Sequence, residues 1–220
     1  MTSNYFTINS GNLTGRIFRA EIIEVQKPNI ARKIADYLIP PPVVQIKLFE
    51  IFNAGGLNEI HQELQDLEFY RQASMGMMCQ VDLYQLDQLG NPSPLEYQLS
   101  QQIPLNNNQL ISPPILCTTK LTGNRVTEGT VVYYEGKNTL MFAFADLSVQ
   151  LLGNFALSYR IFHIFGYSTQ SAGTVIPVVA NCFGGSFRVY SSHDFPGLQP
   201  STMLTKLTEM SFINVVTSKM

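Results

Sequence analysis

The amino-acid sequence predicts an all-β fold, a β-sandwich with one inserted helix and a short C-terminal helix. Apolar and polar residues alternate with period two in many short segments rich in β-branched and aromatic side chains, which is typical of strands. The connections between these segments are rich in proline and glycine, of which the chain has 12 and 15. About nine short strands with such connections favour a single sandwich domain.

The strongest strand signal lies in residues 140–165. From Phe155 to Phe165, every second residue is aromatic, aliphatic or histidine. Gly153-Asn154 separates the two apolar halves of the stretch, and both residue types tolerate positive φ. The stretch therefore predicts a long central β-hairpin, which needs a second sheet or a partner to cover it.

The remaining elements follow from the same patterns. Further strands are expected in residues 16–25, 43–48, 75–86, 115–121, 130–134, 175–180 and 186–190. Apolar residues at helical spacing predict a helix within Gly55–Tyr70, and Ser201-Thr202 is a candidate N-cap for a helix within residues 200–209. Residues 91–114 are expected to form a surface loop. Residues 1–15 are expected to be a flexible N-terminal arm, and residues 16–220 a single domain.

Charge is scarce and unevenly distributed. Charged residues make up 14% of the chain, below the usual roughly 25%, which favours a surface reserved for a partner. The net charge of −2 gives no global attraction to nucleic acid. Residues 1–50 carry a small basic excess, with Arg16, Arg19, Lys27, Arg32, Lys33 and Lys47 against four acids, whereas residues 51–100 carry only Arg71 against seven acids. An anion-binding surface would therefore be local and N-terminal.

The sequence predicts no enzyme, metal, cofactor or small-molecule substrate. Cys79, Cys117 and Cys182 are widely spaced, which favours a reducing compartment over a disulfide framework or a metal site. Residues 191–194, Ser-Ser-His-Asp, contain the residue types of a hydrolase triad, but neighbours along a strand point in different directions. Asp146 lies in an apolar run, where it is expected to accept backbone N–H groups at a bend. No apolar run is long enough to span a membrane, so no membrane partner is expected.

Three separated segments, in this order, resemble the velvet family of fungal regulators. The first is Pro28-Asn29-Ile30-Ala31-Arg32 followed by PPPVVQIK at residues 40–47. The second is FAFADLSVQLLGNFALSYRIF at residues 142–162, and the third is FRVYSSHDFPGLQPSTMLTKL at residues 187–207. Their order and spacing make the match specific over roughly residues 18–215.

The resemblance implies an immunoglobulin-like sandwich of the Rel/NF-κB type. It further implies a transcription regulator that forms a homodimer, or a heterodimer with another velvet protein, and binds double-stranded DNA. Control of fungal development, sporulation and secondary metabolism is expected, in the nucleus or alternatively in the cytoplasm.

Five cations are the candidate DNA-binding residues. Lys27, Arg32 and Lys33 lie after the first expected strand, where a Rel-type fold presents residues to DNA, and arginine can bind phosphate or a guanine edge. Arg16 and Arg19 extend this set if the N-terminal arm lies along the DNA backbone. The alternative for Arg32 is a structural role within its own loop.

The main rival is a velvet-type heterodimerisation partner with little DNA affinity of its own. In the family, several lysines and arginines usually precede the three prolines, whereas here the segment is KIADYLI, with only Lys33 as a cation. Each missing cation removes part of the phosphate-dependent affinity. A third hypothesis, an enzyme on a β-sandwich, rests only on Asp146 and the histidines.

Overall fold

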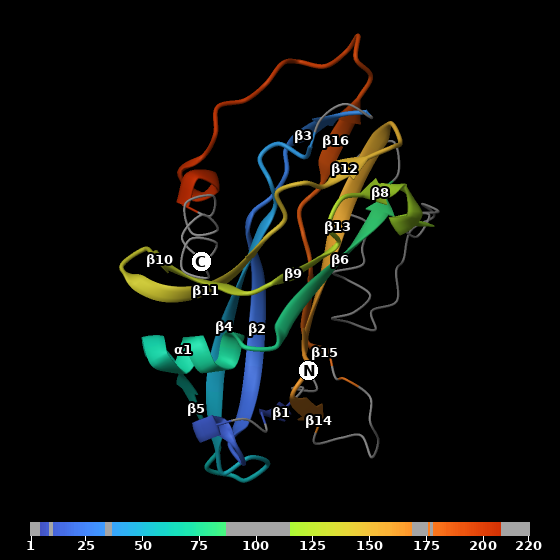
Figure 1. Ribbon diagram of the computed structural model, residues 1–220. Helices are drawn as coiled ribbons and strands as arrows, with labels where there is room; N and C mark the ends of the chain where they lie inside the picture. Colours follow the sequence, from blue (N-terminus) through green and yellow to red (C-terminus); the bar gives the residue numbers. More distant parts are fainter. Residues whose placement is uncertain are drawn as a thin grey trace.

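Two β-sheets pack face to face in the computed structural model (Figure 1), which describes residues 5–8, 11–33, 37–86, 115–168, 176 and 178–207. The first sheet has the strand order β10 (Thr130–Tyr134), β11 (Lys137–Ala143), β4 (Val43–Phe52), β2 (Ile17–Gln26), β1 (Tyr5–Ile8), β14 (Gly166–Ser168), with β5 (Ile60–Glu63) paired to β4. The second has the order β3 (Ile30–Arg32), β16 (Phe187–Tyr190), β13 (Gly153–His163), β6 (Met77–Gln85), β7 (Ile115–Leu116), with β15 (Val178–Phe183) on β13 and β9 (Val126–Glu128) on β6. A small pair joins β8 (Leu121–Thr122) to β12 (Ser148–Val149).

The core lies between the two sheets and confirms the predicted all-β sandwich. Met77, Cys79, Val81 and Leu83 alternate along β6, and all four are fully buried. On the facing sheet, β4 begins at Val43, directly after the three prolines, as the sequence predicts. Alternating side chains from both sheets fill one continuous cluster, which is the arrangement expected for a sandwich.

The expected hairpin at residues 140–165 is wrong. Its first half forms β11, which bonds to β4 in the first sheet, whereas its second half forms β13, which bonds to β6 in the second. Asn154 is paired inside β13 opposite Arg188 and is not part of a turn. The chain instead crosses between the sheets through residues 144–152, so each apolar half is covered by different neighbours.

The helix expected within Gly55–Tyr70 is also wrong in position. Gly55 (φ 76°) lies in the turn of a β4–β5 hairpin, and the Leu57 side chain is fully exposed. The helix α1 spans Leu67–Ser74 instead, and Asp66 caps it by accepting the Phe69 N–H at 2.9 Å. The residues that α1 buries are Phe69, Tyr70 and Ala73, so the apolar face begins where the predicted helix ends.

The N-terminal residues differ from the expected flexible arm. Residues Tyr5–Ile8 form β1, which is bonded to β2 and β14, and Phe6 and Ile8 are buried in the core. Leu13 is buried too. The polar composition of this segment conceals three apolar side chains, and their burial between the sheets outweighs the cost of ordering the chain.

The short C-terminal helix is confirmed as a helical turn at residues 203–207. The Thr202 hydroxyl oxygen accepts the Thr205 N–H at 3.1 Å, which is the predicted type of N-cap. Leu204 packs against Val43 and Met141 on the outer face of the first sheet. The surface loop expected at residues 91–114 lies outside the described residues.

A buried polar contact joins the two sheets near one end of the sandwich. The Tyr159 hydroxyl of β13 donates to the Glu24 carboxylate of β2 at 2.7 Å, and the Gly185 N–H donates to the other oxygen at 2.6 Å. Burial raises the pKa of Glu24 and that of Tyr159 above their ordinary values. The buried Glu24 carboxylate therefore needs both hydrogen-bond donors to offset the free-energy cost of its burial.

We expect Tyr159→Phe to lower the free energy of unfolding by about 1–3 kcal/mol, because Glu24 would lose one of its two donors. Urea denaturation of Tyr159→Phe, Glu24→Gln and the double variant measures the coupling between the two side chains. The double variant should cost less than the sum of the two single variants. Strictly additive costs would show that the contact contributes nothing.

Candidate nucleic-acid interface

The parallel pair β3–β16 places two arginines on one outer surface. Phe187 and Val189 of β16 point into the core, so Arg188 and Tyr190 point outward. Arg32 is in register with Tyr190. Side chains of directly adjacent residues in neighbouring strands share a face of the sheet, so Arg32 lies beside Tyr190 on the outer face.

Aromatic rings orient both guanidinium groups. The Arg188 Cζ atom lies 5.2 Å from the centre of the Tyr190 ring, and the Arg32 Cζ atom lies 5.5 Å from the centre of the Phe195 ring. Such contacts are worth about 0.5–1 kcal/mol at exposed sites. They limit the conformations of the two arginines.

Two lysines lie near the two ends of β16. The Lys27 ammonium donates to the Ser186 carbonyl at 3.3 Å, just before the strand. The Lys33 N–H donates to the Tyr190 carbonyl at 2.9 Å, at its end. We name Lys27, Arg188, Arg32 and Lys33 the β16 basic row. With about 3.3 Å per residue over the four steps from Ser186 to Tyr190, the row is about 13 Å long.

The structure does not bring Arg16 and Arg19 to this row. Both lie near the start of β2, whereas Lys27 follows its end, and ten residues of strand span about 33 Å (Figure 1). Arg16 donates through Nε to Glu50 at 2.6 Å and forms a second bond to the same carboxylate through Nη2. This pairing raises the pKa of Arg16 above its ordinary value.

Arg19 is paired as well, through a 2.6 Å contact with Glu21, and its Cζ atom lies 4.6 Å from the centre of the Phe49 ring. Of the five sequence-predicted cations, Lys27, Arg32 and Lys33 therefore lie around β16, and Arg16 and Arg19 lie at the opposite end of the sandwich. DNA contact by any of the five remains a prediction.

Arg188 was missed by the sequence reasoning, although a signal for it exists. In Phe187–Tyr190, period-two alternation places Phe187 and Val189 on one side and Arg188 on the other. The sequence pattern alone therefore indicated an arginine on the outward side of a predicted strand. Its position next to Arg32 was not visible, because β3 and β16 are separated by more than 150 residues and pair only in the folded chain.

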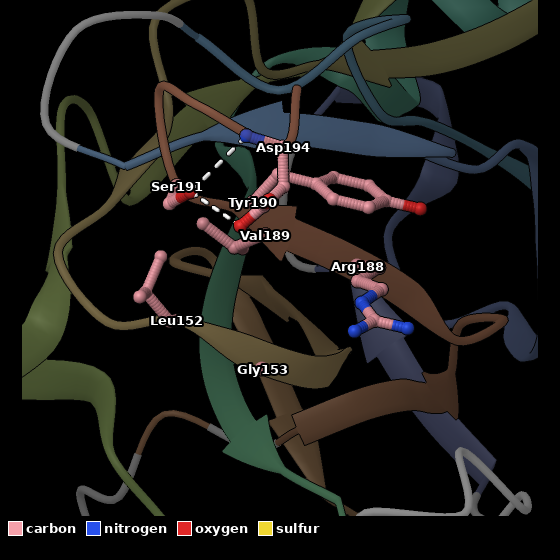
Figure 2. A pocket seen from close by; sticks show the side chains of 7 residues that line it. All are labelled: Leu152, Gly153, Arg188, Val189, Tyr190, Ser191 and Asp194. Carbon is pink, nitrogen blue, oxygen red and sulfur yellow. Dashed lines mark hydrogen bonds between the residues drawn. The ribbon is translucent and has the colours of Figure 1, made fainter. Parts of the chain in front are cut away.

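A shallow cavity of about 390 Å³ adjoins the row (Figure 2). Its lining consists of Leu152, Gly153, Arg188, Val189, Tyr190, Ser191 and Asp194. Asp194 is held by its neighbours: its Oδ2 atom accepts the Ser191 hydroxyl at 2.6 Å, and its Oδ1 atom lies 3.1 Å from the His193 Nδ1 atom. These two contacts lower the pKa of Asp194, so the carboxylate is ionised at neutral pH.

The Ser-His-Asp segment does not have the geometry of a catalytic triad. Ser191 and His193 both bind the carboxylate of Asp194, whereas a triad requires a histidine between the serine and the acid. Asp146, the other residue behind the enzyme hypothesis, accepts the Asn124 N–H at 3.0 and 3.1 Å, which confirms its predicted structural role. Among the described residues, no group of three histidines, cysteines or acids is arranged to hold a metal ion.

The fold and the site together define a class: a β-sandwich protein with a row of four cations around one strand, β16. None of the described helices is both long and apolar enough to cross a membrane. The model of the velvet factor family matches residues 90–215. The chain is 34% identical over 204 residues to a probable velvet family sexual development regulator of Schizophyllum commune, covering 89% of this chain and 71% of that protein.

A second such regulator, of Laccaria bicolor, is 32% identical over 242 residues, covering 90% of this chain and 69% of its own length. The chain therefore belongs to the velvet family. A shorter match, 35% identical over 75 residues, links it to velvet complex subunit 2 of Gibberella moniliformis and covers 33% of this chain and 17% of that protein.

Proposed function

We propose that this chain is a transcription regulator that binds double-stranded DNA through the β16 basic row and controls development in a fungus. The observation that carries the proposal is the gathering of four cations within about 13 Å. Duplex DNA has one phosphate per strand for every 3.4 Å of its axis, so the row matches about four phosphate spacings. The proposed site of action is the nucleus, with the cytoplasm as the alternative.

The family supports the regulatory part of this proposal. Two relatives that align with most of the chain are named sexual development regulators. We propose the same role here, including sporulation and secondary metabolism. The action would be stoichiometric binding, with no bond made or broken.

The salt dependence of binding tests the phosphate contacts. Affinity of the purified chain for a random-sequence duplex, measured by fluorescence anisotropy between about 50 and about 200 mM salt, should fall with a logarithmic slope between about −2 and −4. Lys27→Gln/Lys33→Gln should reduce the magnitude of that slope by about 1.8, because each phosphate contact contributes about 0.9. A slope near zero for the unmodified chain would contradict DNA binding through this row.

Arg19→Gln/Arg71→Gln is the matched control. It removes the same charge, from the end of the sandwich that carries β5 and α1, and should leave the slope unchanged. An equal effect of both double variants would mean that total charge, not the β16 basic row, governs binding.

The second candidate is a heterodimer partner of a more basic velvet protein. The end of the sandwich opposite the row favours it, since the β4–β5 hairpin exposes Phe52, Leu57 and Ile60 beside acidic residues. Exposed apolar side chains among like charges are typical of a docking surface. Light scattering of this chain, alone and mixed with a basic velvet protein, tests the idea, and a chain that stays monomeric in both samples would contradict it.

A further inference from the structure

The cavity beside the β16 basic row combines a donor and an acceptor of opposite charge. Arg188 and Asp194 both line it, with Tyr190 and Ser191 between them in the sequence (Figure 2). Phosphate binding accounts for the arginine but not for the aspartate, because an ionised carboxylate repels phosphate. A ligand that offers a hydrogen-bond donor fits the carboxylate at this position, in addition to its bonds with Ser191 and His193.

We infer that this cavity reads the major-groove edge of a G·C base pair, with Arg188 donating to guanine and Asp194 accepting from cytosine. The inference rests on the proposed DNA binding and adds sequence selection to it. In the major groove, guanine presents the O6 and N7 acceptors, which match the forked donors of an arginine, and cytosine presents the N4 amino group.

Asp194 is pre-oriented for such a contact. The Ser191 hydroxyl donates to its Oδ2 atom at 2.6 Å, and the Asp194 N–H donates back to the Ser191 oxygen at 3.2 Å. His193 binds the other carboxylate oxygen. A carboxylate has about four acceptor sites, so each oxygen retains one for a ligand. The side chain is 68% exposed, so a base edge can reach it.

Arg188 is held in a comparable way. Its Cζ atom lies 5.2 Å from the centre of the Tyr190 ring, and this contact limits the conformations of the guanidinium group. The side chain is exposed, and no acid binds it among the contacts of the described residues. A·T is the weaker fit, because adenine N6 can donate to Asp194 but thymine offers Arg188 a single acceptor instead of two.

Selection from a randomised duplex pool tests the inference, with the unmodified chain, Asp194→Asn and Arg188→Gln compared. The unmodified chain should enrich a G·C pair at one fixed position. Asp194→Asn keeps the acceptor for the Ser191 hydroxyl but brings an amide that prefers adenine, so preference for G·C there should fall about tenfold. Arg188→Gln should lose the guanine preference at that position.

Lys33→Gln is the control, because a phosphate contact carries no sequence information. It should weaken binding to all duplexes alike and reduce the salt slope by about 0.9. Salt-dependent binding without a sequence preference, or a preference that Asp194→Asn leaves unchanged, would overturn the inference and leave the proposed function standing. A chain without salt-dependent binding would overturn both.

Discussion

Gly123→Ala is expected to lower the free energy of unfolding by at least about 3 kcal/mol. Gly123 has φ +97°, a conformation that costs an L-residue about 1–2 kcal/mol. A Cβ atom at this position would also lie 2.1 Å from the Asp146 carbonyl oxygen and 2.7 Å from its carbonyl carbon. Both contacts are with backbone, so no side-chain rotation relieves them and the two loops must move apart.

The damage should extend beyond the glycine itself. Separation of the two loops would break the bonds from the Asn124 N–H to the Asp146 carboxylate. The next residue, Leu147, is buried in the core and accepts a backbone bond from Leu38, which precedes the three prolines. Strain at Gly123 would therefore reach the end of the sandwich that carries β3 and the basic row.

Gly136→Ala supplies the control for backbone conformation alone. Gly136 has φ +81° in the β10–β11 turn, and a Cβ atom there would have nothing within 4 Å. Its substitution should cost about 1–2 kcal/mol. Urea midpoints of both variants measure the difference, and equal costs at the two glycines would show that the approach of Asp146 is unimportant.

Protonation of His163 alone should lower the free energy of unfolding by up to about 3 kcal/mol as the pH drops from 7 to 4. The side chain is fully buried, and burial lowers its pKa from 6.5 to about 4, although the nearby Ala73 backbone opposes the shift. The His163 Nδ1 atom accepts the Phe165 N–H at 3.2 Å, which requires a neutral acceptor. Each pKa unit is worth about 1.4 kcal/mol.

The direction of this pH effect on stability depends on whether the folded or the unfolded chain binds the proton. Between pH 6.5 and about 4 the unfolded chain is protonated at this histidine and the folded chain is not. The contribution is therefore fully present above pH 6.5, is lost progressively below it, and is absent below about pH 4. Other groups titrate in the same range, so the measurement must compare variants.

His163→Gln removes the titrating group and keeps a polar side chain. Its urea midpoint should depend less on pH between 4 and 6.5 than that of the unmodified chain. His193→Gln is the control, because the His193 side chain is 96% exposed and should leave this dependence nearly unchanged. A pH dependence that survives in His163→Gln would assign acid lability to another group.

The local sequence pattern was sufficient to predict the buried side of a strand wherever one face of that strand packs against the core. The alternation in β6 and the start of β4 after the prolines are examples, since a period of two determines the buried side without knowledge of the partner strand. The Thr202 cap and the role of Asp146 were predictable for a similar reason, because each satisfies backbone N–H groups near a turn.

Predictions failed where the answer depended on distant segments. Residues 140–165 form strands of two different sheets, and the choice between a hairpin and a crossover was made by β4 and β6, which pair with the two halves. Residues 5–8 form a strand only because β2 and β14 offer edges on both sides. Composition and periodicity contain no information about such partners.

The amino-acid sequence thus determined the all-β class, the alternating core positions and the family resemblance, because each depends on residue types at short spacing. Only the tertiary structure decided which cations lie close together. Lys27, Arg32 and Lys33 join Arg188, about 155 residues further along, because β3 pairs in parallel with β16. Arg16 and Arg19, close to Lys27 in the sequence, lie near the other end of β2, since an extended chain separates its ends most.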